Sequence, residues 1–259
     1  MQLPPDLPWE PKTLDNDAVL VIRNAQMDAL RDSREAECIA GLELCLRESF
    51  PRDVTRLSSE ELHTVVRLGM ERSRSHGGVT AQDMYLYLAL MFMLGSYFDE
   101  DPQLAWAQEL LARGRSIEAL HAQTLHYLND VAGRENEHLI KALARIRKLD
   151  LPMFPDAGAP DFESRMLASL RAVYPTKFDA QSEAANQELV HLGRSLAARH
   201  SMPGAGAALM AGMAFLLGAS FDRDPLHPWI QDALHEPGGE SRFHDLHRRA
   251  LEFVEMALT

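Results

Sequence analysis

The sequence contains little cysteine and has fewer basic than acidic residues. Only two of the 259 residues are cysteine, which fits a reducing compartment, where disulfides are rare. Lys and Arg together number 26 against 38 for Asp and Glu, so the formal net charge is −12. A protein that binds the phosphate backbone needs a basic stripe, so this balance argues against nucleic-acid binding. It is compatible with a basic protein partner.

Strand patterns and the common catalytic motifs are also absent. No alternating apolar–polar run bounded by turns supports a β-strand. The sequence has no Gly-x-Ser-x-Gly elbow, no phosphate-binding Gly-x-x-x-x-Gly-Lys and no dinucleotide Gly-x-Gly-x-x-Gly after a strand. His244 and His247 are spaced to share a metal, but a solvated helix face is the favoured interpretation. We therefore expect a protein that is not an enzyme and has no cofactor or metal.

The sequence also lacks a secretory signal and a convincing membrane span. Residues 1–11 have no basic start and no apolar core, and four prolines interrupt them. We interpret residues 1–19 as an extended Pro-rich arm. The uncharged stretch Ser201–Phe221 contains Pro203 and four glycines, and its helical part is shorter than the roughly 20 residues that a bilayer requires. A buried core helix is favoured there, which predicts a cytoplasmic protein without membrane contact.

The two cysteines, Cys38 and Cys45, lie in one predicted helix. Their spacing places them on one face about 10 Å apart along the helix axis, beyond disulfide reach. We expect both to be buried thiols.

An internal repeat decides the expected architecture. Met91–Trp106 and Ala214–Trp229, here called the first and second motif segments, are identical at 8 of 16 positions at a constant offset of 123 residues. Upstream, Leu46-Arg47, Pro51, Val66, Leu68 and Gly69 recur at an offset of 124. The sequence therefore predicts an all-α fold of two pseudo-equivalent helical repeats with about five helices each, packed as a bundle. The predicted boundaries are 1–19 for the arm, 20–131 for repeat 1, 132–160 for a connecting helix and Pro-rich linker, and 161–259 for repeat 2.

Periodicity and capping signals place the helices of each repeat. We expect a long helix over 24–50, a second helix that begins after a Ser58–Glu61 capping box, and a third that begins at Thr80 with Asp83 as its partner. The third helix is apolar nearly all round, which predicts a central position. A fourth helix is expected to begin at Asp101-Pro102 and at Asp224-Pro225. The last helices are expected over 116–129 and 240–258, and the third helix of repeat 2 is rich in Ala and Gly.

The Phe-Asp-x-Asp-Pro-x-x-x-Trp pattern is the sharpest local signal. Its acidic side chains are candidates for binding a basic partner or a cation: Asp99, Glu100, Asp101, Asp222 and Asp224. The favoured interpretation is structural, with Asp101 and Asp224 as helix N-caps, prolines in the first turn and a Trp that anchors the helix on the core. The candidate structural residues are Gly95, Pro102, Trp106, Gly218, Pro225 and Trp229.

Five stretches of the first repeat resemble a family of small helical bacterial proteins. They are Ile22-Arg-Asn-Ala-Gln-Met27, Leu46-Arg-x-x-Phe-Pro51, Val66-x-Leu-Gly-x-Glu-Arg72, Met91-Phe-Met-Leu-Gly-x-x-Phe-Asp-x-Asp-Pro102 and Trp106. Members of this family are often encoded beside type VI secretion components, such as PAAR spike-tip proteins and their toxins. The resemblance covers residues 20 to about 130 and implies a context of toxin delivery or protection, without catalytic residues to carry over.

Three functional hypotheses follow. The leading one is a non-catalytic adaptor or chaperone that binds a secreted toxin or its spike-tip carrier. The second is an immunity protein whose acidic surface blocks a cognate toxin. The third is a metal-dependent helical enzyme that uses His and Asp side chains.

Overall fold

The computed structural model describes residues 24–114, 116–132, 137–150 and 153–258. These residues form helices and turns, with no strand among them, so the all-α prediction is confirmed. The chain divides into two compact units, residues 1–38 and 39–259. The predicted arm over 1–19 lies outside the described residues. The first helix, α1, is Asn24–Ser49, close to the expected 24–50.

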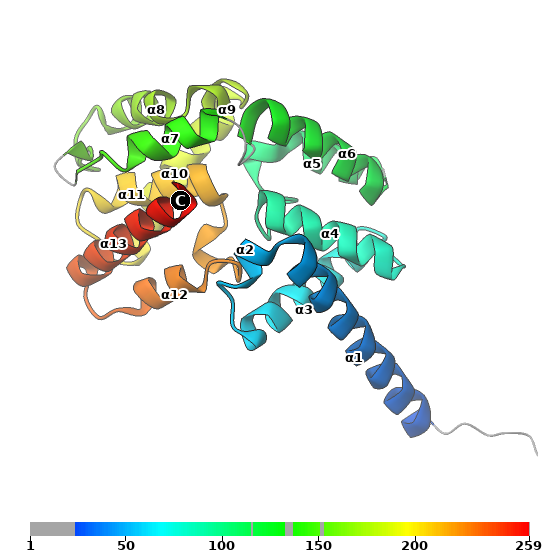
Figure 1. Cartoon of the computed structure of the whole chain (residues 1–259). Helices are drawn as coiled ribbons and strands as arrows, with labels where there is room; N and C mark the ends of the chain where they lie inside the picture. Colours follow the sequence, from blue (N-terminus) through cyan, green and yellow to red (C-terminus); the bar gives the residue numbers. More distant parts are fainter. Residues whose placement is uncertain (1–23, 115, 133–136, 151–152, 259) are drawn as a thin grey trace, which may run out of the picture. The chain divides into compact units, whose positions relative to one another are not determined.

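Six helices follow α1 as far as residue 150 (Figure 1). They are α2 (Pro51–Val54), α3 (Ser59–Ser75), α4 (Ala81–Leu94), α5 (Ala105–Ala112), α6 (Ile117–Tyr127) and α7 (Glu137–Ile146). A 3₁₀ turn, η1 (Pro102–Leu104), precedes α5, and a π turn, η2 (Leu128–Ala132), follows α6.

The remaining described residues form another six helices. They are α8 (Phe162–Val173), α9 (Pro175–Asp179), α10 (Glu183–Arg199), α11 (Gly206–Leu217), α12 (Pro228–His235) and α13 (Gly239–Leu258). A 3₁₀ turn, η4 (Phe221–Arg223), connects α11 to the segment before α12.

Local capping chemistry begins the helices where the sequence predicts them. Ser58 accepts a hydrogen bond from the backbone N–H of Glu61 at 3.2 Å, and the Glu61 carboxylate accepts one from the Ser58 N–H at 2.6 Å. Thr80 and Asp83 form the same reciprocal pair at the start of α4. Each box satisfies N–H groups that the first helical turn leaves without a partner.

The start of α12 differs from the prediction. The helix begins at Pro228 rather than at Asp224-Pro225, and Pro225 lies in a turn. A residue before a proline is disfavoured in the helical region, and His227 accordingly has φ −128° and ψ 59°. Pro228 then occupies the first helical position, where its missing N–H costs nothing.

The cysteine prediction is wrong in one respect. Both thiols are free, but Cys45 is exposed and Cys38 is only partly buried. The face of α1 that carries Cys45 does not pack against the core, whereas Leu42 and Leu46 on the other face are 4% and 0% exposed.

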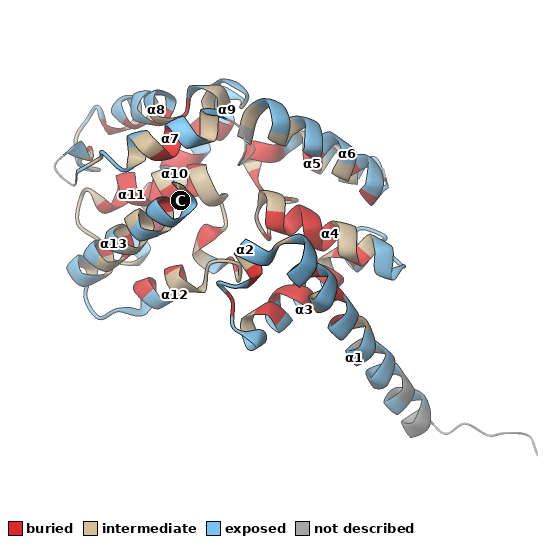
Figure 2. Cartoon of the chain, in the orientation of Figure 1, coloured by how far each residue is buried: buried red, intermediate tan, exposed pale blue. Residues whose placement is uncertain are grey.

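The buried residues gather on α4, α10 and α11 (Figure 2). The uncharged stretch around α11 is a core helix, as predicted, since nine of its twelve residues are buried. Among the described residues, no helix is both long and apolar enough to span a membrane. Helices α10 and α11 approach closely at Gly193, where an added Cβ would come within 2.6 Å of the backbone of α11 at Ala207 and Ala211.

Two glycines on these packed helices are expected to respond in opposite ways to alanine. Gly193→Ala should lower the free energy of unfolding by about 1–3 kcal/mol, because the new methyl group overlaps the α11 backbone. Gly212→Ala should raise it by about 0.5–1 kcal/mol, because an added Cβ there meets nothing within 4 Å and alanine has the higher helix propensity. Urea unfolding of both variants checks this, and changes of the same sign would contradict the packing described here.

Candidate functional site

The two equivalent aspartates of the motif segments are buried and reach across to each other's segment. Asp101 is 4% exposed and Asp224 is 2% exposed. One carboxylate oxygen of Asp101 accepts the Gln103 N–H at 2.9 Å, and the other accepts the Ala219 N–H at 3.0 Å. The first bond caps η1, as the sequence predicts, and the second joins the first motif segment to the second.

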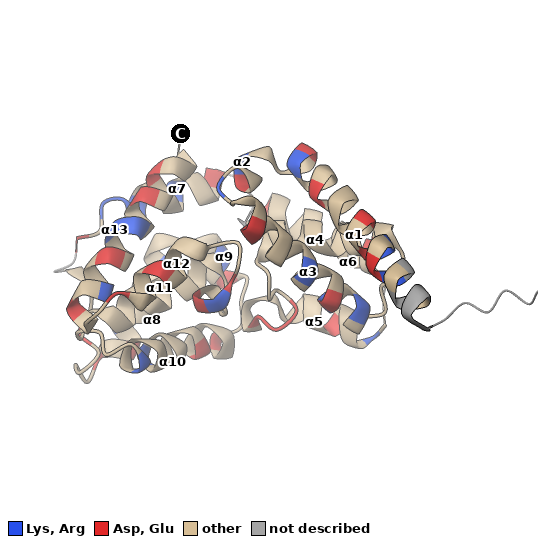
Figure 3. Cartoon of the chain, turned by 90° about the horizontal axis from the view of Figure 1, so that it is seen from below, with Lys and Arg blue, Asp and Glu red and all other residues tan. Residues whose placement is uncertain are grey.

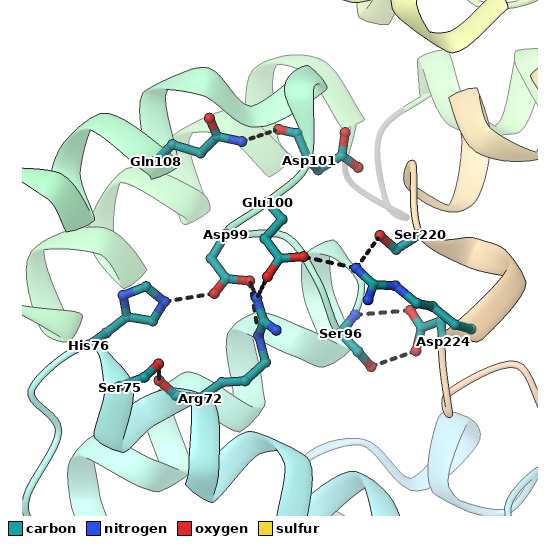
Figure 4. Close-up of polar contacts among 11 residues, drawn as sticks. Arg72, Ser75, His76, Ser96, Asp99, Glu100, Asp101, Gln108, Ser220 and Asp224 are labelled. Atoms are coloured by element: carbon teal, nitrogen blue, oxygen red, sulfur yellow. Dashed lines mark hydrogen bonds and ion pairs between the residues drawn. The ribbon is translucent and has the colours of Figure 1, made fainter. Parts of the chain in front are cut away.

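Asp224 makes the reciprocal set of hydrogen bonds (Figure 4). Its Oδ1 accepts the Leu226 N–H at 2.9 Å, and its Oδ2 accepts the Ser96 N–H at 2.9 Å. The Ser96 hydroxyl adds a third bond at 2.5 Å. Ser96 and Ala219 are themselves equivalent positions at the offset of 123. We call this arrangement of Gly95, Ser96, Asp101, Gly218, Ala219 and Asp224 the paired-Asp junction.

Glycine is required on both sides of the paired-Asp junction. Gly95 has φ +102° and Gly218 has φ +109°, a region that side chains with a Cβ rarely adopt. An added Cβ would also lie 3.2 Å from the Leu217 carbonyl oxygen at Gly95, and 3.0 Å from Asp101 Oδ2 at Gly218. Both glycines end a helix, and the turn that follows presents an N–H to the aspartate of the other segment.

An ion-pair network borders the paired-Asp junction (Figure 4). Arg72 donates to Asp99 at 2.6 Å and to Glu100 at 2.8 Å, and His76 bonds Asp99 at 2.7 Å. Burial raises the pKa of Asp99, but the bonds from Arg72 and His76 outweigh it, so that pKa lies below its ordinary value. The hydrogen bond from Arg72 is the main reason that the pKa of Glu100 is also lowered.

Glu100 further pairs with Arg223, its equivalent in the second motif segment. The Glu100 carboxylate lies 2.9 Å from the Arg223 guanidinium. The guanidinium groups of Arg72 and Arg223 lie over the Tyr97 ring, 4.9 and 4.1 Å from its centre. An acid and a base at matched positions thus face each other where the two segments meet.

The five acidic side chains that are candidates for partner binding are mostly buried. Among these five carboxylates, only the Glu100 side chain is substantially exposed, at 51%. The side chains of Asp99 and Asp222 are 2% and 17% exposed, and Asp101 and Asp224 are buried. The reason is that most of these carboxylates accept hydrogen bonds inside the protein, so they contribute little to a docking surface. The prediction of Asp224 as a helix N-cap is wrong, because α12 begins at Pro228 and Asp224 instead accepts the Leu226 N–H in the preceding turn.

The two tryptophans lie against aromatic rings, consistent with anchoring. Trp106 is 5.6 Å from the Tyr127 ring, and Trp229 stacks on Phe253 at 5.7 Å between ring centres. Pro102 opens η1. Pro225 does not open a helix, as noted above.

The late histidines do not converge on one point. His244 faces Glu240 at 3.5 Å, whereas His247 lies between the rings of Phe154 and Phe243. Burial is the main cause of a lowered pKa for His247. In the part of the chain that the structure describes, no three His, Cys, Asp or Glu residues are grouped to hold a metal ion.

A large apolar cavity is the feature that sequence reasoning missed. Its volume is about 1270 Å³, and it is lined by residues of α2, α4, α7, α8, α11 and α13 and by the junction residues Gly95, Asp101 and Gly218. Six of the chain's 12 methionines line it: Met91, Met93, Met153, Met166, Met213 and Met256. We call it the central cavity. No sequence motif marks it, because its lining residues come from elements that are far apart in the chain.

Two residues on the face of α11 that lines the central cavity are small. Ala208 and Gly212 lie four residues apart on one side of the helix, beside larger lining residues such as Met213 and Leu216. Tyr85 of α4 lies 123 residues before Ala208, and its hydroxyl bonds Ser49 at 2.7 Å.

Three of the residues that line the central cavity have exposed apolar side chains. Ile140, Met153 and Met256 are 49%, 60% and 52% exposed. Large apolar side chains scattered singly on a surface are ordinary, but their grouping around a cavity is typical of a binding site.

One cation lies deep in the central cavity. Lys177 of α9 is 9% exposed, and its ammonium group donates to the Phe215 carbonyl oxygen at 2.5 Å. It also lies over the Phe215 ring, 5.3 Å from the centre. Burial lowers the pKa of Lys177 to about 8, while the charge of Asp101 opposes that shift. The lysine thus occupies the carboxyl end of α11, where a cation is favoured.

Comparison of the chain with known protein families, with curated proteins and with solved structures finds no match.

The reciprocal hydrogen bonds predict similar losses on either side of the paired-Asp junction. Asp101→Asn and Asp224→Asn should each lower the free energy of unfolding by about 1–3 kcal/mol, because an amide cannot accept all of these bonds and its NH₂ group would face backbone donors. Asp222→Asn is the control, since its pair with Arg199 is long at 3.5 Å and should contribute less than about 1 kcal/mol. Urea unfolding gives all three values, and a loss confined to one aspartate would contradict a reciprocal junction.

The buried amine predicts a pH dependence of stability. The pKa of Lys177 is about 8 in the folded chain and near 10.4 in an unfolded chain, so the unfolded state binds more protons between these values. The stability of the wild type relative to Lys177→Met should therefore rise from pH 8 to pH 10.5 by about 2 kcal/mol. Thermal or urea unfolding of both proteins across this range measures the difference. If the stabilities of the two proteins change equally with pH, the pKa of Lys177 is not lowered by folding.

Proposed function

We propose that this chain is a non-catalytic protein-binding module that holds an apolar helical segment of a partner in the central cavity. The partner is a secreted bacterial toxin or its PAAR spike-tip carrier, and the chain acts as its adaptor or chaperone in the cytoplasm. The central cavity is the observation that carries this proposal. The resemblance of residues 20–130 to proteins encoded beside type VI secretion components supplies the context.

The composition of the central cavity favours a protein segment over a compact small molecule. Its volume of about 1270 Å³ exceeds the roughly 300–1000 Å³ of ordinary small-molecule sites. Methionine side chains are flexible and polarisable, and Met-rich grooves accept apolar helices of varied sequence. Exposed apolar side chains such as Met153 and Met256 would be covered by such a segment.

The two small residues of α11 that line the central cavity, Ala208 and Gly212, favour a helical occupant. At Gly212 an added Cβ meets no atom within 4 Å, and Ala208 lies one turn before it. Small side chains at a spacing of four residues allow another helix to approach closely. An adjacent side of α11 already shows such an approach, where Ala207 and Ala211 lie against the backbone of α10 at Gly193.

We also propose that the two halves of the chain are diverged copies of one unit. The support is the conserved offset between the motif segments, the matched φ values of Gly95 and Gly218, and the reciprocal bonds of Asp101 and Asp224. In this view the ancestral unit paired with a copy of itself.

Gly212→Leu is the test of this function. The variant should fold, since its Cβ has room, but its side chain would enter the central cavity and block a helical occupant. Wild-type chain co-expressed with the products of the adjacent genes should co-purify with a toxin or its carrier, and Gly212→Leu should retain less than about a tenth of that yield.

Gly41→Leu is the matched control, because Gly41 lies on the exposed side of α1 and its Cβ also meets nothing within 4 Å. Equal capture by wild type and Gly212→Leu, or no capture of any neighbour, would refute the proposal. Protection of cells that express the toxin would instead identify an immunity protein, since a chaperone need not protect.

A further inference from the structure

The charge of the central cavity differs in sign from that of the chain. Five basic residues line it, Arg52, Arg56, Lys177, Arg248 and Arg249, against the three acidic residues Asp53, Asp101 and Glu252. The lining is therefore +2, whereas the whole chain is −12. Figure 3 shows basic and acidic residues together on α2 and α13, which contribute most of these charges.

The charges contributed by α13 are largely balanced by neighbours. Arg248 pairs with Asp245 and with Glu252, and Arg249 pairs with Asp245 at 2.8 Å. Arg56 of the segment after α2 lies over the Phe253 ring, 5.4 Å from its centre. The excess positive charge is thus concentrated near α2 and at Lys177.

Lys177 is the deepest of these cations and has no carboxylate partner. An ammonium group has three donors, and the hydrogen bond from Lys177 goes to a neutral carbonyl oxygen, that of Phe215. Among the described residues, no carboxylate lies within the 4 Å of an ion pair. Asp101 acts on it only at longer range, and its own oxygens accept from Gln103 and Ala219.

A buried cation without a carboxylate in contact is expensive, because its desolvation is offset by the helix dipole, one neutral acceptor, the Phe215 ring and the more distant charge of Asp101. Helix α11 could end without a lysine, since Gln103 already donates to the neighbouring carbonyl of Ala214 at 2.9 Å. An apolar side chain of similar volume would serve the packing of α9 at lower cost. The lysine therefore points to an anionic group that enters the central cavity.

We propose that the helical segment held in the central cavity carries a carboxylate, and that this carboxylate pairs with the ammonium group of Lys177. This inference rests on the proposed function and specifies the chemistry of its partner. It replaces the expectation of a basic partner, which the net charge of the chain suggested, with an apolar segment that has an acidic residue facing α11.

Synthetic peptides test the inference directly. The probes are 16-residue helices of Leu, Met and Ala with lysines at both ends, and a single Glu is placed at each of four consecutive central positions in turn. Their matched controls carry Gln at the same positions. Four consecutive positions cover one full turn, so one Glu must face α11 in any orientation of the helix.

Wild-type chain should bind the best Glu peptide about tenfold or more tightly than its Gln counterpart, as expected for a charge-assisted hydrogen bond. Lys177→Gln should remove this preference, while it keeps a donor for the Phe215 carbonyl oxygen. Lys148→Met removes the same charge from an exposed position on the surface and should leave the preference unchanged. Titration calorimetry provides the dissociation constants, and urea unfolding confirms that each variant is folded.

Two outcomes separate this inference from the proposed function. If Glu and Gln peptides bind equally and Gly212→Leu blocks both, the cavity holds helices but the carboxylate pairing is refuted. If no peptide binds at all, both the inference and the helical occupant are refuted. Dodecanoate is the comparison ligand, and its binding through Lys177 in the absence of peptide binding would identify a fatty-acid site and overturn the inference.

Discussion

The paired-Asp junction is the interaction on which the rest of the structure depends. A buried carboxylate is costly unless its oxygens accept hydrogen bonds, and here each aspartate accepts one N–H from its own segment and one from the other. The second N–H is available only because Gly95 and Gly218 turn the chain through a backbone conformation that a Cβ would oppose. In each segment the glycine turn presents an N–H group and the aspartate accepts one. Both hydrogen bonds cross to the other segment, so each segment depends on the other.

The paired-Asp junction also determines where helices α4 and α11 end. Because Gly95 and Gly218 end α4 and α11, the junction brings the carboxyl ends of these two helices toward the central cavity, where Lys177 meets the end of α11. Aromatic pairs hold the adjoining helices in matched ways, with Phe50 on Phe92 at 5.0 Å and Tyr174 near Phe215 at 6.5 Å. Hydrogen bonds and aromatic contacts thus hold together the elements that line the cavity.

Local features were predictable from the sequence, and long-range ones were not. The capping boxes at Ser58 and Thr80 involve residues three apart, so the pattern contains the whole interaction. The role of Asp224 toward Ser96 joins residues 128 positions apart, and the same Asp-x-Asp-Pro pattern is compatible with a cap, a surface loop or a junction. The start of α12 was predicted at Pro225 but lies at Pro228, because a proline at either position is compatible with the first turn of a helix. The cavity escaped prediction because an unfilled space leaves no motif.

Differences between the two halves therefore carry more functional information than their identities. The motif segments agree at the glycines and aspartates that the paired-Asp junction requires. Outside the motif segments the two halves differ at residues that line the cavity: Ala208 lies 123 residues after Tyr85, and Lys177 lies 124 residues after Asp53. The first difference opens space and the second reverses a charge. A stabilising core would favour a filled space and a neutral side chain at these places, whereas the proposed occupant, an apolar segment with one acidic group, would use both differences. The overall charge of −12 governs solubility and approach, but recognition depends on the local charge that the occupant meets.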